Sequence, residues 1–250
     1  MPVIFIPAER FLMSLKRLLR EVRMCRVCEA DLPLGPRPVV QLASTARLLI
    51  VGQAPGSKVH LSVSFSAWFT NGKENVSGFY HAGTKDSTWT WRNTEGGRDM
   101  LGHSKEDRQD GLWKYWYPNG QLSSTGLYRA GKQEGEWLYY YDGGQKWRRG
   151  AFKNGEKDGQ WTTWFESGQK LQEGGYAGGK EEGLWNSWFE NGQQKDKGSY
   201  KQGQMDGIWQ GWLPNGTQSY MATWKDNMKN GPWKSWYDSG KPNESGSFAN

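Results

Sequence analysis

The chain has few cysteines, few histidines and no long apolar run, and each shortage argues against a class of protein. Two cysteines in 250 residues cannot build a disulfide framework, so we expect a reducing, cytoplasmic location. The apolar run Val3–Ile6 is too short for a signal-peptide core or a membrane span. The histidines His60, His81 and His103 share no metal-ligand spacing. We therefore expect no transmembrane segment and no cofactor.

Aliphatic residues are also scarce, since Leu, Ile, Val and Phe together make up 16% of the chain. So low a share is typical of disorder when the net charge is high and aromatic residues are few. Here the net charge is +6 and aromatic residues reach 14%, with 16 Trp beside 34 Gly. The composition therefore predicts a folded chain whose apolar burial is carried by aromatic rings.

Composition changes sharply near residue 60. Every Trp lies beyond that point, and the first 60 residues carry nine Lys or Arg against four Asp or Glu. The remaining residues are almost neutral, with 23 basic against 22 acidic side chains. We expect an N-terminal extension (1–12), a short second segment (13–60) and a repeat domain (61–250). Nucleic-acid binding is disfavoured for the nearly neutral repeats and stays open for a basic helix predicted within Arg10–Met24.

A 24-residue period organises the repeat domain. An anchor tryptophan recurs at this spacing from Trp89 onward, with Phe65 one period earlier, and a second ring usually follows three residues later. A glycine lies seven residues after each anchor, and a third ring follows at positions such as Tyr128 and Tyr176. We expect a structural ladder rather than a stacking platform for single-stranded nucleic acid. Its predicted members are Trp89, Trp113, Trp116, Trp137, Trp161, Trp164, Trp185, Trp188, Trp209, Trp212, Trp233 and Trp236.

Each period is typical of a β-hairpin. In Leu112–Gly135, the strand-like LWKYWY precedes the turn PNGQ and a second strand LSSTGLYR. Asn-Gly pairs such as Asn71-Gly72 suit the positive φ angles of tight hairpin turns. The predicted fold is mainly β: an elongated single-sheet meander of eight hairpins, with a short α/β segment before it. An anchor and the ring three residues later have opposite parity, so either both faces carry rings or a bulge brings them together.

The motif G-x-W-x-x-W-Y-x-N-G-Q, followed by G-x-Y-x-x-G-K, resembles the MORN-repeat variant. Gly111–Gly131 and Gly183–Gly203 show it most fully, whereas Trp89–Ser104 lacks the second and third rings, so we expect a kink or an irregular seam there. The resemblance implies a binding scaffold for proteins or lipids. Bacterial proteins of this kind are commonly labelled antitoxins of toxin–antitoxin systems.

Residues 13–60 resemble the start of a uracil-DNA glycosylase of the iron–sulfur-related group, through C-x-x-C, GPRPVVQ and IVGQAPG in that order. The family's second cysteine pair and its later histidine loop are missing, and the Gln53 amide cannot act as a carboxylate base. We expect a truncated, inactive segment, natural or constructed in origin. Cys25 and Cys28 are either half of a metal site or two free thiols.

The repeats therefore predict a non-enzymatic scaffold that binds a protein, and the resemblance suggests an antitoxin that masks a cognate toxin. The alternatives are a glycosylase-related DNA repair protein and a membrane-surface or assembly scaffold. Contacts with the partner are expected at exposed positions just after the anchors, namely Lys114, Tyr115, Tyr139, Thr163, Ser187, Gly211 and Ser235.

Overall fold

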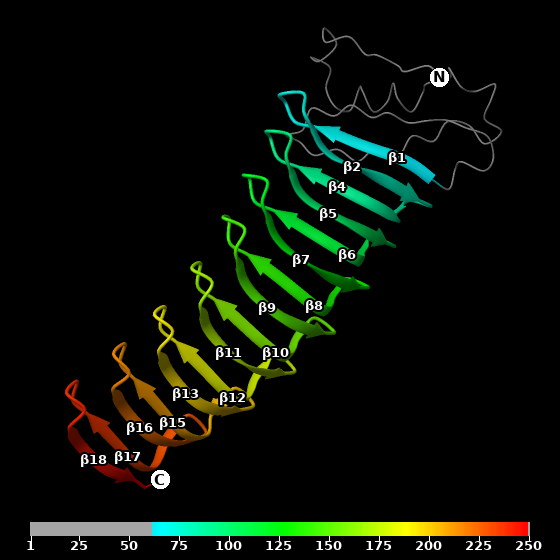
Figure 1. The fold of residues 1–250 in the computed structure, drawn as a ribbon. Coiled ribbons are helices and arrows are strands. Elements are labelled where there is room, and N and C mark those ends of the chain that lie inside the picture. Colours follow the sequence, from blue (N-terminus) through cyan, green and yellow to red (C-terminus); the bar gives the residue numbers. More distant parts are fainter. Residues whose placement is uncertain (1–61, 250) are drawn as a thin grey trace, which may run out of the picture. The chain divides into compact units, whose positions relative to one another are not determined.

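The computed structural model describes residues 62–249, and the chain divides into two compact units between Gly120 and Gln121. The expectations for residues 1–60, including Cys25, Cys28 and Gln53, lie outside the described residues. All regular elements in the described part are strands (Figure 1). No helix found there is long and apolar enough to cross a bilayer.

The first unit is an open antiparallel meander in chain order. Consecutive strands are paired, except that β3 and β4 both pair with β2. Its strands are β1 (Ser62–Trp68), β2 (Glu74–His81), β3 (Thr84–Lys85), β4 (Ser87–Arg92), β5 (Arg98–Lys105) and β6 (Arg108–Trp116). The hairpin of β4 and β5, where an irregular seam was expected, has the same register as its neighbours, with Trp89 opposite Gly102.

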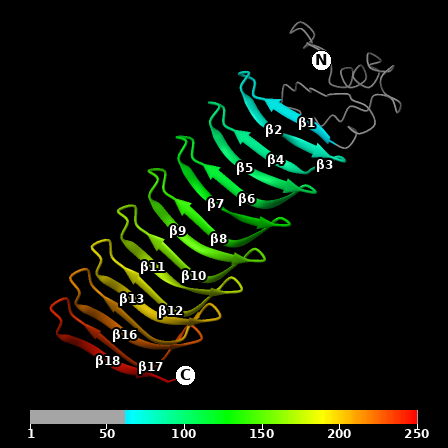
Figure 2. The ribbon, with the colours of Figure 1, turned by 45° about the vertical axis from the view of Figure 1, so that its right-hand side comes forward.

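The second unit follows the same plan (Figure 2). Consecutive strands are paired, except that β14 and β15 both pair with β13. Its strands are β7 (Leu122–Arg129), β8 (Lys132–Tyr140), β9 (Lys146–Lys153), β10 (Glu156–Trp164), β11 (Lys170–Ala177), β12 (Lys180–Trp188), β13 (Gln194–Lys201), β14 (Gln204–Met205), β15 (Gly207–Trp212), β16 (Gln218–Lys225), β17 (Met228–Trp236) and β18 (Pro242–Phe248). The predicted all-β meander of hairpins is confirmed in both units.

The predicted Asn-Gly pairs lie in the first loops of four hairpins, and in these pairs only the glycine has positive φ. In the first loop of unit 1, Gly72 has φ 83° and its N–H donates to the carbonyl of Phe69 at 3.0 Å. The Asn71 carboxamide accepts from the N–H of Lys73 at 3.0 Å and donates to the carbonyl of Thr94, in the next loop, at 2.8 Å. Asn191 donates in the same way to the carbonyl of Pro214 at 2.8 Å. These asparagines therefore join successive repeats as well as shaping their own loops.

The two-residue turns with positive φ at both positions lie in the other loop of the repeat. Ala130 and Gly131 have φ 49° and 84°, and Asn154 and Gly155 have φ 54° and 88°. Both angles suit a type I′ turn, whose twist matches that of the flanking strands. The tight type I′ geometry thus belongs to the second loop of the repeat, whereas the Asn-Gly pairs had predicted it for the first loop.

Glycines in the second strands make room for the anchors. Gly102, Gly126, Gly150, Gly174 and Gly198 each lie beneath the indole of the anchor in the following strand, where a Cβ would overlap the ring. The anchors are consequently the core: Trp89, Trp113, Trp137, Trp161 and Trp209 are 1–7% exposed. The face on which these indoles lie is called the anchor face below. At the C-terminal end Ala222 replaces the glycine opposite Trp233, which is only half-buried and packs against Gly246 instead.

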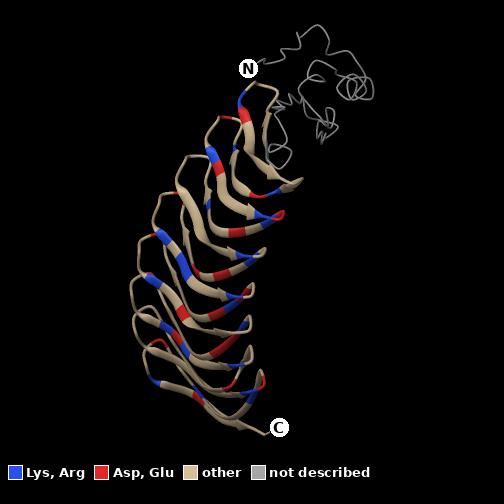
Figure 3. Ribbon diagram, turned by 90° about the vertical axis from the view of Figure 1, so that its right-hand side faces the viewer, with Lys and Arg blue, Asp and Glu red and all other residues tan. Residues whose placement is uncertain are grey.

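Charge is interspersed in both units. Figure 3 shows basic and acidic positions alternating along the strands and loops rather than gathering by sign. Exposed pairs such as Arg149 with Glu136 and Lys73 with Glu95 are typical of solvated surface. The charge pattern therefore does not form a basic groove along the described repeats.

Candidate binding face

Edge-to-face ring contacts run along the anchor face within each unit. In unit 1 the centroid of Trp89 lies 5.0 Å from that of Tyr80. In unit 2 the corresponding distances are 5.2 Å for Trp137 with Tyr128 and 5.1 Å for Trp161 with Phe152. The same contact recurs for Trp185 with Tyr176 at 5.2 Å and for Trp209 with Tyr200 at 5.0 Å. The ladder thus alternates anchors with rings of the second strand, an arrangement that favours aromatic pairs.

An indole hydrogen bond fixes the orientation of most anchors. The Nε1–H of Trp113 donates to the carbonyl of His103 at 2.9 Å, and that of Trp161 donates to the carbonyl of Ala151 at 3.1 Å. Trp137, Trp185 and Trp209 make the equivalent bond at 3.1 Å. Trp89 is an exception, because its Nε1–H is buried without a partner.

The sequence explains this exception. Other repeats have a glycine with positive φ two residues before the anchor, such as Gly111 at 75°, whereas Ser87 stands before Trp89. The Ser87 hydroxyl donates to the carbonyl of Phe79 at 3.1 Å. That carbonyl corresponds to the one that the indole uses in the other repeats.

The rings three residues after the anchors lie outside these contacts. The register of each hairpin shifts just before this position, as between Ser187 and Trp188. These rings lie beneath basic side chains instead. The Cζ of Arg98 is 5.9 Å from the Trp116 centroid, and the Nζ of Lys170 is 5.6 Å from the Trp188 centroid. Trp164, Trp212 and Trp236 are likewise half-buried. Only the anchors among the predicted ladder residues therefore form the ladder together with the second-strand rings.

The residue two positions after each anchor, which we call the spacer, lies on the anchor face. Trp91 is a spacer in unit 1, with its centroid 6.0 Å from Trp89 and 5.5 Å from Trp113. Tyr139 is a spacer in unit 2, at 5.9 Å from Trp137 and 6.4 Å from Trp161. Both rings fill the space between two successive anchors. Later spacers are small or polar: Thr163, Ser187, Gly211 and Ser235.

Six of the seven predicted partner contacts are spacers, and the structure does not leave all of them exposed. Thr163 is 4% exposed, and Gly211 lies beneath the ring of Tyr220. The expectation that these positions are exposed is wrong for Thr163 and Gly211, because the Arg148 side chain bonds to Thr163 and the Tyr220 ring covers Gly211. Tyr115, Tyr139, Ser187 and Ser235 are half-buried. Lys114, one residue after an anchor, is half-buried and pairs with Leu101 rather than lying in the spacer row.

Polar side chains form hydrogen bonds with two of the later spacers, Thr163 and Ser187. The Nε–H of Arg148 donates to the hydroxyl of Thr163 at 3.2 Å. The Ser187 hydroxyl donates to the Asp196 carboxylate at 3.1 Å, and the Tyr220 hydroxyl donates to the same carboxylate at 2.9 Å. Burial raises the pKa of Tyr220 well above its ordinary value, and the hydrogen bond to Asp196 raises it further. The phenol therefore stays a donor across the physiological range.

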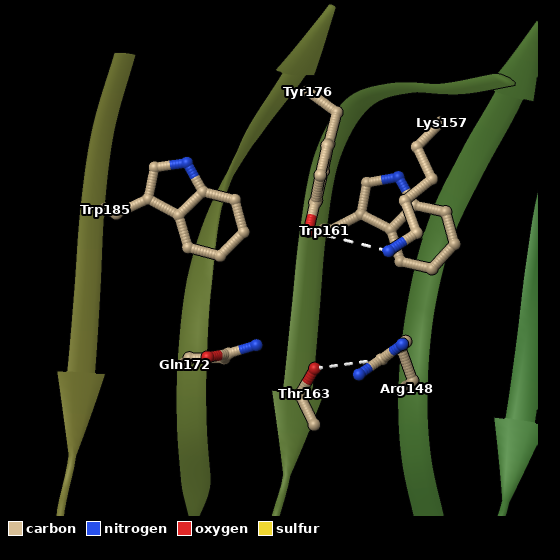
Figure 4. Close-up of a pocket in the computed structure, with 7 residues that line it drawn as sticks. All are labelled: Arg148, Lys157, Trp161, Thr163, Gln172, Tyr176 and Trp185. Atoms are coloured by element: carbon tan, nitrogen blue, oxygen red, sulfur yellow. Dashed lines mark hydrogen bonds between the residues drawn. The ribbon is translucent and has the colours of Figure 1, made fainter. Parts of the chain in front are cut away.

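A shallow depression opens on the anchor face between two anchors of unit 2. Trp161 and Trp185 form its sides, and Thr163 and Gln172 line it beside Arg148 (Figure 4). Lys157 lies at the opposite side, with Nζ 4.9 Å from the Trp161 centroid and 4.5 Å from that of Tyr176. Burial lowers the pKa of Lys157, and the positive charge of Arg148 lowers it further, while Glu181 opposes this.

Sequence reasoning missed Arg148, Lys157 and Gln172. Lys157 lies four residues before its anchor, at the position of Gln133 in the preceding repeat. A usable signal was the contrast between constant and variable positions within the period: the anchors never change, but the residue four before them changes from Gln to Lys to Glu.

Four segments of the chain match the MORN repeat variant. The matched residues are 109–130, 133–154, 157–177 and 229–250. In each of these segments the anchor, the loop glycine and the second-strand ring follow one another at the spacing described above. The match supports a MORN-like repeat scaffold in these segments. No curated protein matches the chain.

Proposed function

We propose that the repeat units bind a protein partner through the anchor face. The observation that carries this proposal is the change in the spacer row of unit 2 while the anchors stay the same. A row serving only the sheet would keep the ring that fills the space between anchors, as at Tyr139. Instead, Thr163, Ser187 and Asp196 bring hydrogen-bonding groups to a face lined by indoles.

The match to the MORN repeat variant supports a scaffold role, because open repeat sheets offer extended surfaces for contacts. The anchor face combines aromatic rings with Arg148 and polar rim groups, which is the composition of protein interfaces. We propose that the chain acts by binding rather than by catalysis, in the cytoplasm.

The narrower proposal concerns the partner, which we infer to be a toxin that the sheet neutralises by covering its active surface. It rests on the family resemblance of the repeats. The test is co-expression of the full chain with the product of a neighbouring toxin gene. Relief of growth arrest and a stable complex support the proposal, whereas unrelieved arrest without a complex contradicts it.

A pair of adjacent arginines allows the binding face to be tested separately. Arg148 is paired with the spacer Thr163 and lies on the anchor face. Arg149, the next residue, points to the other face of the sheet and forms an ion pair with Glu136. With any purified partner, Arg148→Ala should weaken binding at least about tenfold, as expected for a charged contact at an interface centre, while Arg149→Ala should have little effect. The reverse ranking, measured by calorimetric titration, would place binding on the other face.

A further inference from the structure

The repeats themselves show what fits between two anchors. Trp91 occupies this space between Trp89 and Trp113, inclined by 33° to each. Tyr139 occupies it between Trp137 and Trp161, inclined by 29° and 32°. A planar ring nearly parallel to both indoles is therefore the natural filling of this space.

Between Trp161 and Trp185 the spacer is Thr163, which is too short to reach between the indoles. Tyr176 closes one side, with its ring edge-on to both anchors at 6.0 and 5.2 Å. The other side is the depression above Thr163 and Gln172 (Figure 4). The next repeats differ: Ser187 is bonded to Asp196, and Tyr220 covers Gly211.

We propose that this space, which we call the Thr163 slot, receives the side chain of a tyrosine from the protein partner. The proposal rests on the proposed function and names one contact within it. The incoming ring would take the place that Tyr139 holds one repeat earlier, and would continue the row of rings from outside the chain.

The end of the slot favours tyrosine over phenylalanine. The spacer hydroxyls of the chain are hydrogen-bonded: Gln109 donates to the Tyr115 hydroxyl at 3.0 Å, and Gln133 bonds to the Tyr139 hydroxyl. Lys157 stands where Gln133 stands in the preceding repeat. Its ammonium has three donors and lies 3.5 Å from the Tyr176 hydroxyl, so it has donors left for a second phenol oxygen.

Arg148 adds a second reason. Its guanidinium carbon lies 4.9 Å from the Trp147 ring centroid, and only its Nε–H is used by Thr163, so the Nη donors are left for a partner. A guanidinium at the rim suits the backbone carbonyls or a carboxylate beside the partner's tyrosine. The slot thus combines an apolar wall, a donor at its end and a donor at its rim.

The test uses N-acetyltyrosinamide as the probe, added to the isotope-labelled full chain. We expect saturable shifts of the indole N–H signals of Trp161 and Trp185, with the signal of Trp113 unchanged as an internal control. N-acetylphenylalaninamide should bind roughly 2- to 10-fold more weakly, the effect of one net hydrogen bond. Equal binding of the two probes, or equal shifts of all indoles, would overturn the proposal.

Two variants separate the parts of the argument. Thr163→Tyr places the chain's own ring in the slot, as Tyr139 does, and should abolish probe binding, whereas Thr163→Ser should preserve it. Lys157→Met should leave binding of the phenylalanine probe intact and remove the preference for tyrosine. Persistent probe binding to Thr163→Tyr, or an unchanged preference in Lys157→Met, contradicts the slot.

The outcome with a protein partner distinguishes the slot from the proposed function. If a partner binds the anchor face but the probe does not enter the slot, the proposed function stands and the tyrosine contact is wrong. If the probe enters the slot but no partner binds, the slot stands and the scaffold function fails. With both correct, Thr163→Tyr loses the partner and Thr163→Ser retains it.

Discussion

Unit 1 and unit 2 differ in the row of side chains beside the anchors. In unit 1 the paired residues of this row are Val76, Trp91, Met100 and Tyr115, which are apolar or aromatic. In unit 2 the corresponding row holds Tyr139 and then the polar residues Arg148, Thr163, Gln172, Ser187 and Asp196. The comparison teaches that the anchors determine the sheet, while the row beside them is free to change because the anchors already supply the buried core.

The largest expected effect tests whether the anchors are equivalent in the two units. Trp113→Ala in unit 1 and Trp161→Ala in unit 2 should each lower the free energy of unfolding by about 3–5 kcal/mol, because both indoles are nearly fully buried. Hydrogen exchange resolved by strand is the suitable measurement, since repeat units can open separately. A loss below about 1 kcal/mol at one site would show that the anchors do not contribute equally to the two units.

A smaller loss should follow from filling the space beneath an anchor. Gly102→Ala in unit 1 and Gly174→Ala in unit 2 both place a methyl group where the following indole lies. We expect destabilisation of about 1–3 kcal/mol in each unit, the usual cost of overpacking. The matched control combines Gly174→Ala with Trp185→Leu, which removes the overlap. If the double variant loses the sum of the single effects, the methyl group acts through something other than the indole.

Ser87→Gly should act in the opposite direction and only in unit 1. It removes the hydroxyl that occupies the Phe79 carbonyl, and it permits the backbone of the other repeats, so Trp89 gains an acceptor for its buried Nε1–H. The expected gain is about 1 kcal/mol, the net value of one hydrogen bond. The Trp89 indole exchange rate is the direct measurement, and an unchanged rate would contradict this explanation.

Alkaline pH should destabilise unit 2 more steeply than unit 1. Burial raises the pKa of Tyr139, Tyr176, Tyr200 and Tyr220 in unit 2, and of Tyr80 in unit 1. A raised pKa in the folded state means that the unfolded chain releases its proton first, so stability is complete below about pH 10 and falls as pH rises beyond it. Unit 2, with more such tyrosines, should lose exchange protection more steeply between about pH 10 and 11. Equal losses of protection in the two units, or a steeper loss in unit 1, would contradict the attribution of this effect to the buried tyrosines.

Much of the fold follows from the 24-residue period. The hairpins, the anchors and the loop glycines are all visible as fixed spacings, because a strand, a turn and a strand of constant length return each side chain to the same face. The candidate site is less visible. Thr163 was among the predicted contacts for the reason that it follows an anchor, but its burial and its bond to Arg148 depend on the neighbouring strand. Gln172 was missed because the pairing register brings it beside Thr163 from β11. Lys157 lies in the same strand as Thr163, and it was missed because its contacts with Trp161 and Tyr176 depend on side-chain packing.

By itself the sequence determined a sheet of repeated hairpins with a regular row of indoles, since the spacing of the repeat and the parity within a strand are local properties. Only the tertiary structure decided which rings make the ladder, because the register shift before positions such as Trp188 depends on the paired strand. It also decided where the face is open. Whether the space between two anchors is filled depends on side chains from different strands: Tyr139 fills it in one repeat, Tyr220 covers Gly211 in another, and beside Thr163 it stays open.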